Sequence, residues 1–103
     1  MKKQNNIIKN IEATAQRLGG TVRVTRFSYI KEAIVEATFG SRTNLMVNIG
    51  PRGAIKYCSW FMTDSDGDWS VHYDDKRFTG KRNGAEVGRF FNLMQTRAVK
   101  VAA

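Results

Sequence analysis

Apolar and polar residues alternate in several short runs within VRVTRFSYIKEAIVEATFGSRTNLMVNIGPRGAIKYCSWF, the segment of residues 22–61. A period of two is typical of strands that pack one face on a core and turn the other face to water. The alternation resumes near residue 69, so the sequence predicts five strands. Their inward-facing residues are predicted to be Val22 and Val24; Ala33, Val35, Ala37 and Phe39; Leu45, Val47 and Ile49; Ile55, Tyr57 and Phe61; and Trp69, Val71 and Tyr73.

Helical periodicity flanks this segment on both sides. The first predicted helix covers about residues 6–18, with Asn5 or Asn6 as N-cap and Gly19-Gly20 as the stop signal. A second helix is predicted to begin after residues 83–84. The apolar stripes of the two helices consist of Ile7, Ile8, Ile11, Ala15 and Leu18, and of Val87, Phe90, Phe91, Met94, Ala98 and Val101.

Short turns rich in Gly, Pro and Asp separate the predicted strands at residues 40–42, 50–53 and 66–67. Connections this short make neighbouring strands antiparallel. The sequence therefore predicts one α+β domain over residues 1–103. Its N-terminal helix, five-stranded antiparallel meander and C-terminal helix follow one another, and both helices bury their stripes on the same sheet face.

Composition is typical of a folded protein in a reducing compartment. The chain is 42% hydrophobic, and its single cysteine, Cys58, has no partner for an internal disulfide. The N-terminus lacks the apolar region of a signal peptide, and no long apolar run predicts a membrane span. We expect a soluble cytoplasmic protein, with an edge strand that can pair with a second copy in a homodimer.

The net charge of +8 is the sum of two unlike parts. Five of the nine acidic residues lie between Asp64 and Asp75, a window without Lys or Arg. The rest of the chain carries all seventeen Lys and Arg residues against four acids, a balance of 17 − 4 = +13. A cationic body of this kind attracts anionic partners, provided that its cations gather on one exposed side.

The predicted open face of the sheet suggests single-stranded nucleic acid as such a partner. Cations bind phosphates, amides contact bases, and an exposed aromatic ring stacks on a base. The alternative is an ordinary polar sheet surface, with the one large aromatic packed elsewhere. The residues predicted on this face are Arg23, Thr25, Asn44, Met46, Asn48, Lys56, Trp60 and His72.

A second candidate for phosphate binding is the start of the C-terminal helix. Lys81 and Arg82 precede its predicted first turn, and Arg89 and Lys100 lie further along it. The unpaired N–H groups and positive dipole end of a helix favour phosphate. The alternative is a solvated loop in which Asn83 serves only as the N-cap.

The acidic window suggests three interpretations. Asp64, Asp66 and Asp68 have the spacing of a calcium loop, but the sixth position is Trp69 where such a loop needs glycine. A solvated hairpin turn fits better, and Arg42 is then expected at the same end as a counter-charge. The acid-x-lysine triplet of residues 74–76 also occurs in metal-dependent nucleases, without the upstream acid on a neighbouring strand. We therefore predict no metal site, no cofactor and no catalytic residues.

These observations predict a small non-enzymatic nucleic-acid-binding protein for DNA or RNA. The predicted nucleic-acid-binding residues are Arg23, Lys56, Trp60, Lys81, Arg82, Arg89 and Lys100. The alternative is an adaptor or inhibitor of the type encoded by phages and mobile elements, which binds a host protein or nucleoprotein complex. In that case Asp64, Asp66 and Asp68 would dock a basic groove.

Overall fold

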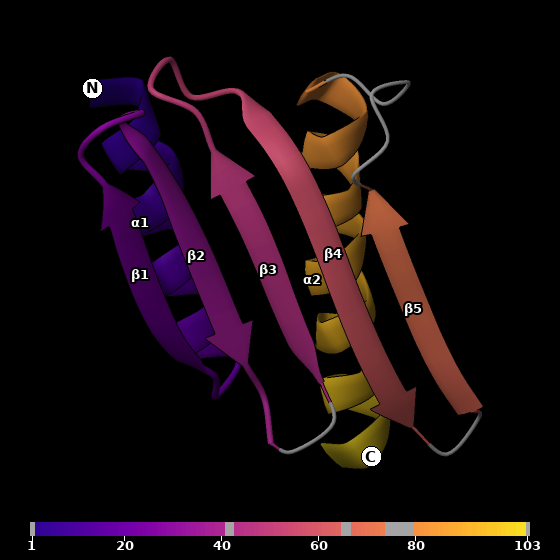
Figure 1. Cartoon of the computed structure of the whole chain (residues 1–103). Coiled ribbons are helices and arrows are strands. Elements are labelled where there is room, and N and C mark those ends of the chain that lie inside the picture. Colours follow the sequence, from indigo (N-terminus) through magenta and orange to yellow (C-terminus); the bar gives the residue numbers. More distant parts are fainter. Residues whose placement is uncertain (1, 41–42, 65–66, 74–79, 103) are drawn as a thin grey trace.

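The computed structural model of the chain describes residues 2–40, 43–64, 67–73 and 80–102, with side chains for residues 2–40, 43–62 and 85–96. An antiparallel sheet of strand order β1-β2-β3-β4-β5 follows an N-terminal helix and precedes a C-terminal helix (Figure 1). The predicted α+β class is confirmed. The elements are α1 (Lys2–Arg17), β1 (Thr21–Phe27), β2 (Glu32–Thr38), β3 (Asn44–Ile49), β4 (Ile55–Asp64), β5 (Gly67–Tyr73) and α2 (Gly80–Ala102).

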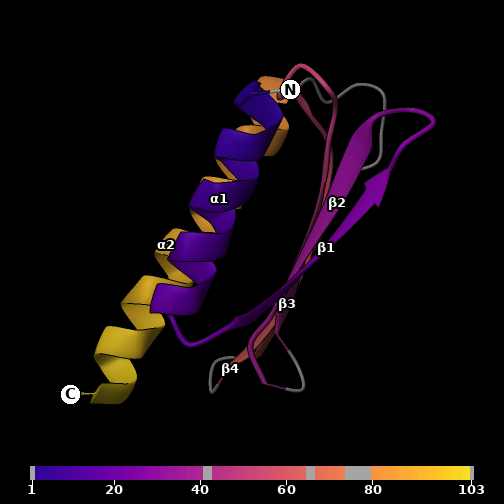
Figure 2. The ribbon, with the colours of Figure 1, turned by 90° about the vertical axis from the view of Figure 1, so that its left-hand side faces the viewer.

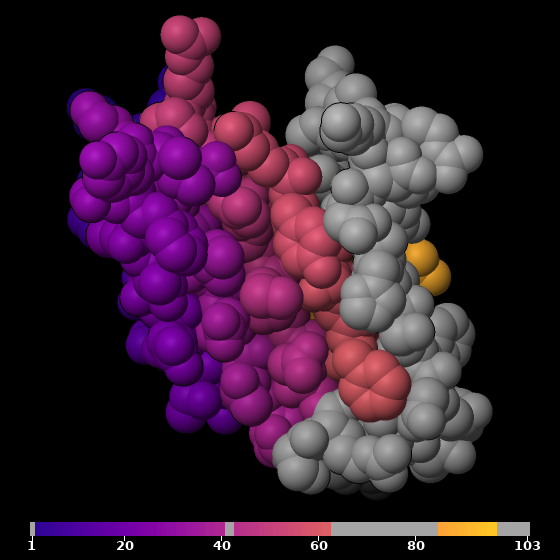
Figure 3. All heavy atoms as spheres, viewed as in Figure 1, coloured from indigo at the N-terminus to yellow at the C-terminus, as the bar shows by residue number. Residues whose placement is uncertain are grey.

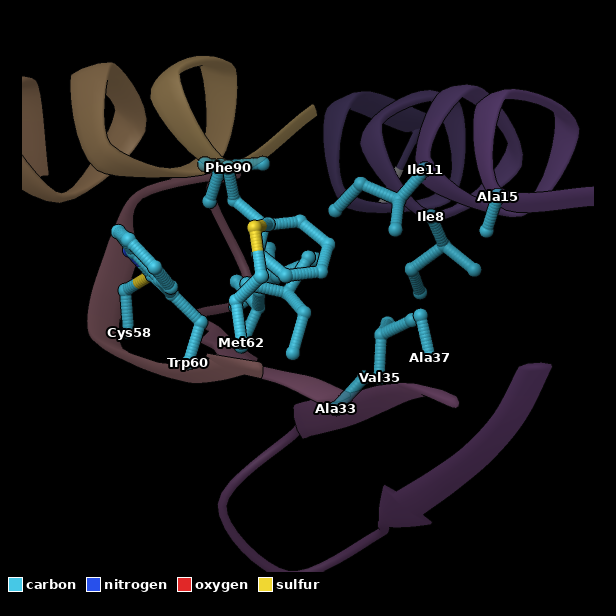
Figure 4. Packing of buried hydrophobic residues seen from close by; sticks show 14 residues of the cluster. Ile8, Ile11, Ala15, Ala33, Val35, Ala37, Cys58, Trp60, Met62 and Phe90 are labelled. Carbon is cyan, nitrogen blue, oxygen red and sulfur yellow. The ribbon is translucent and has the colours of Figure 1, made fainter. Parts of the chain in front are cut away.

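Both helices lie on the same side of the sheet, and the other face carries no helix among the described residues (Figure 2). Helix α1 packs on β1 and β2, while α2 packs mainly on β4. Their apolar stripes meet the inward residues of the strands in one core (Figure 4). The buried hydrophobic residues are Ile8, Ile11, Ala15, Ala33, Val35, Ala37, Leu45, Val47, Ile49, Cys58, Trp60, Met62, Val87 and Phe90.

Helix α1 begins at Lys2, four residues before its predicted start at residue 6. Asn5 and Asn6 are therefore helical residues and neither is an N-cap. Instead, Gln4 occupies the buried stripe one turn before Ile8 and bonds to the neighbouring turns, which holds the first turn against the sheet. Long-range contacts thus extend a helix that local capping signals alone would start later.

The end of α1 matches the predicted stop at Gly19-Gly20. The Gly20 N–H donates to the Ala15 carbonyl at 2.8 Å, and the Gly19 N–H donates to the Gln16 carbonyl at 3.0 Å. Gly19 has a φ of 88°, which glycine adopts without strain. This pair of bonds is the Schellman arrangement that satisfies the last helical carbonyls.

Strand β4 presents the opposite face from the predicted one. Ile49 pairs with Ile55 while Asn48 pairs with Tyr57, so one extra residue, Lys56, stands in β4 at this irregularity. After a bulge of one residue, every following residue of the strand points to the face opposite to the one that simple alternation predicts. Cys58, Trp60 and Met62 are consequently buried under the helices, and Tyr57 and Phe61 lie on the open face at half-buried positions.

Helix α2 also begins earlier than predicted, at Gly80. Lys81 and Arg82 are therefore part of its first turn and do not precede it. Both are good helix formers, which is why the helix continues through them toward Gly80. Phe90 anchors α2 to the sheet, because its buried ring lies 5.7 Å from the Trp60 ring and 5.8 Å from the Phe39 ring, centroid to centroid.

Candidate nucleic-acid interface

The open face of the sheet lacks the predicted base-stacking residue. Trp60 is only 1% exposed and lies on the helix side, so its assignment to the open face is wrong. Figure 3 views the open face directly. The described side chains that alternation and register place on this face include Arg23, Thr25, Glu32, Ile34, Glu36, Asn44, Met46, Asn48, Lys56, Tyr57 and Phe61.

Charges on the open face are largely compensated within the face. Lys56 Nζ lies 3.1 Å from Glu32 Oε2, and Asn48 Nδ2 donates to Glu32 Oε1 at 3.1 Å. Arg23 is exposed, and it stands directly opposite Glu36 in the β1–β2 register. Because Arg23 and Lys56 each have a carboxylate beside them, the described part of this face offers phosphate little net charge.

Trp60 instead connects β4 to the second turn of α2. Its Nε1 donates to Glu86 Oε2 at 3.4 Å, and the Arg89 guanidinium lies 5.8 Å from the centre of its ring. Arg89 Nη1 is also 3.7 Å from Glu86 Oε1. Arg89, predicted to bind phosphate, is thus half exposed but already engaged with a carboxylate and an aromatic ring.

Three separate segments converge at one end of the molecule, which we call the turn end. They are the first turn of α1, the β1–β2 turn of residues 28–31 and the β3–β4 turn of residues 50–53 (Figure 1). The buried side-chain amide of Gln4 joins them, because its two Nε2 hydrogens are shared among the carbonyl oxygens of Lys31, Ile49 and Gly50, at N···O distances of 2.9, 3.1 and 3.2 Å.

Close packing completes the turn end. A side chain at Gly53 would place its Cβ 3.1 Å from Lys3 Cβ and 3.2 Å from Ile7 Cδ1, so the β3–β4 turn lies directly against α1. The turn also has Gly53 at a φ of 89°, where other residues are strained. The turn end is therefore a packed part of the fold, in which the backbones of the three segments lie close together.

Cations from all three segments gather at the turn end. Helix α1 also adds its positive dipole end here, without an acidic residue in its first turn. The Glu32 carboxylate at the margin is bonded to Lys56. The exposed cations of the turn end are Lys2, Lys3, Lys31 and Arg52, together with Arg26 near the end of β1, which donates from Nη1 to Asn5 Oδ1 at 3.2 Å.

An apolar group lies at the same end, on the β1–β2 turn and on the last residue of β1. The side chain of Tyr29 is 100% exposed, and those of Ile30 and Phe27 are 58% and 40% exposed. Sequence reasoning missed these residues because they break the alternation between β1 and β2. Three large apolar residues around a turn, next to Lys31 with its positive φ of 57°, form a group that the strand pattern does not account for.

For most of the other predicted site residues, the structure describes the backbone but not the side chain. The backbone places Lys81 and Arg82 in the first turn of α2, near the turn end, and Lys100 in its last turns at the opposite end (Figures 1 and 2). Asp64 ends β4 and Asp68 pairs with Thr63 in β5, so both lie at the end opposite the turn end. Asp66 and Arg42 lie outside the described residues.

The single cysteine, Cys58, is buried in the core. Burial, and secondarily the charge of Glu86, raises the pKa of the Cys58 thiol from 9.0 to about 12, which keeps it protonated and unreactive. Among the residues described, no group of three His, Cys, Asp or Glu side chains is placed to hold a metal ion. None of the described helices is long and apolar enough to cross a membrane.

Comparison of the chain with models of known protein families, with curated protein sequences and with solved structures finds no match.

Proposed function

We propose that this chain is a small non-enzymatic nucleic-acid-binding protein that contacts phosphate groups of DNA or RNA through the turn end. The observation that supports this proposal is the gathering of exposed cations from three segments tied together by Gln4. Lys and Arg side chains bind the phosphate backbone and release its counterions, which supplies most of the affinity in sequence-independent binding. The turn end replaces the open sheet face as the proposed site.

Removal of charge from the turn end tests this proposal. Lys31→Gln with Arg52→Gln removes two exposed cations from two of its three segments. The matched control, Lys9→Gln with Arg17→Gln, removes two exposed cations from α1 beyond its first turn, so both double variants have the same net charge. Affinity for labelled 20-nucleotide single strands and 20-base-pair duplexes is measured by fluorescence anisotropy over a range of salt concentrations.

We expect the Lys31→Gln/Arg52→Gln protein to bind more weakly than the control. The slope of log affinity against log salt should fall by roughly 0.7–0.9 for each phosphate that the variant no longer neutralises. Equal reductions of affinity in the two double variants would mean that only total charge matters and would reject the turn end as the site. Negligible binding of the unaltered protein at low salt would reject the function itself.

The alternative function, an adaptor or inhibitor that binds a host protein, is favoured by one feature. Asp64 and Asp68 lie at the end opposite the turn end, so acidic residues and the cations of the turn end are separated in space. Asp64→Asn, Asp66→Asn and Asp68→Asn together neutralise these acids. Loss of a protein partner in pull-downs from nuclease-treated lysate, with nucleic-acid affinity unchanged or increased, would favour the inhibitor.

A further inference from the structure

The turn end carries a hollow beside its apolar group. This hollow has a volume of about 370 Å³ and is lined by Gln4, Arg26, Phe27, Ser28, Lys31 and Glu32. Its volume falls within the range of about 300–1,000 Å³ that is common for sites of small organic groups. Two cations, one carboxylate and one aromatic ring thus line this shallow, open hollow, and the fully exposed Tyr29 follows the lining residue Ser28 in the chain.

From this arrangement we infer that the β1–β2 turn binds unpaired bases of a single-stranded nucleic acid. One base stacks on Tyr29, and a neighbouring base enters the hollow against Phe27, while Arg26 and Lys31 meet the adjoining phosphates. The inference rests on the proposed function and specifies which form of nucleic acid the turn end prefers. Stacking requires bases that are free of a duplex, so it selects single strands over paired ones.

Other occupants of this surface fit less well. A second copy of the chain would bring two cationic turn ends together, which like charges oppose. An anionic lipid surface would attract the cations and accept Tyr29 and Ile30, but a flat bilayer leaves the hollow unfilled.

The test is Tyr29→Ala with Tyr29→Phe as the conservative variant. Because the Tyr29 side chain is wholly exposed, neither change should disturb folding, and circular dichroism checks this. The probes are labelled 20-nucleotide mixed-sequence single strands and 20-base-pair duplexes, followed by anisotropy at low salt. We expect Tyr29→Ala to weaken single-strand binding on the order of five- to a hundredfold, with duplex binding unchanged and Tyr29→Phe close to the unaltered protein.

The hollow has its own variant. Ser28→Leu adds an apolar side chain at a lining position, and it should lower single-strand affinity while leaving duplex affinity unchanged. Unchanged single-strand affinity in either Tyr29→Ala or Ser28→Leu, or equal reductions on single strands and duplexes, would overturn the inference. Loss of flotation with phosphatidylcholine–phosphatidylglycerol vesicles in Tyr29→Ala, at full single-strand affinity, would overturn it in favour of a lipid surface.

The variants distinguish failure of base stacking at the β1–β2 turn from failure of nucleic-acid binding as a whole. If Lys31→Gln/Arg52→Gln lowers affinity but Tyr29→Ala does not, phosphate binding stands and base stacking at the turn falls. If the unaltered protein binds neither probe at low salt, both fall together.

Discussion

Replacement of Trp60 by alanine should greatly destabilise the fold. It should not selectively weaken nucleic-acid binding, as the loss of a ring that stacks on bases would. The Trp60 side chain is 1% exposed, packs 5.7 Å from the Phe90 ring and donates a hydrogen bond to Glu86. Truncation of a buried tryptophan of this kind costs about 3–5 kcal/mol. Since small domains unfold with a free energy of about 5–15 kcal/mol, the variant should lose a large share of its stability.

Trp60→Phe separates packing from hydrogen bonding at the same position. The phenyl ring keeps the contact with Phe90 but leaves the Glu86 carboxylate without its indole donor, at a cost of about 1–2 kcal/mol for this long bond. Urea unfolding followed by circular dichroism measures both free energies. A cost of Trp60→Ala within about 0.5 kcal/mol, as surface substitutions give, would refute the buried placement. So would a selective loss of single-strand affinity in a fully stable Trp60→Phe protein.

Three further changes probe the elements that build the turn end and the core. Gln4→Met should reduce the free energy of unfolding by about 1–3 kcal/mol in urea titrations, because buried carbonyls lose their donor, whereas Gln16→Met on the exposed side of α1 should cost little. Gly53→Ala should cost about 1–3 kcal/mol because of its positive φ and its contact with α1, while Gly88→Ala, with nothing within 4 Å of the new Cβ, should not destabilise. The pKa of the Cys58 thiol is about 12 in the folded protein and 9.0 when the thiol is exposed in the unfolded chain. The unfolded chain therefore loses this proton at lower pH, and the free energy of unfolding should fall as pH rises from 9.0 toward 12. Cys58→Ala should show a shallower decline over that window, and a thiol that reacts with Ellman's reagent at pH 8 as fast in the folded state as in urea would contradict the burial.

Local sequence patterns are sufficient to identify most elements of this fold. The alternation in residues 33–37 and 45–49 correctly predicts inward Ala33, Val35, Leu45 and Val47, because a strand that buries one face must repeat every second residue. The stripe of Ile8, Ile11 and Ala15 predicts the buried side of α1 for the corresponding helical reason. These predictions succeed because the physical cause lies within a few residues of its effect.

Alternation alone could not identify which face of β4 is buried. Tyr57 and Phe61 are apolar enough to be core residues, and Cys58, Trp60 and Met62 are equally suitable. Pairing with β3 decides between them, because the bulge at Lys56 places Trp60 opposite Leu45 on the helix side. A one-residue shift between two strands therefore moves the expected stacking residue into the core.

The turn end likewise exists only in three dimensions. Lys3, Lys31 and Arg52 are ordinary cations in the sequence, and each lies in a different segment of the chain, far from the other two. They become neighbours because Gln4 donates to carbonyls of both turns and Gly53 allows the β3–β4 turn to lie against α1. Local chemistry specifies helices and strands, but the meeting of distant charges depends on packing between elements, which no single stretch of residues encodes.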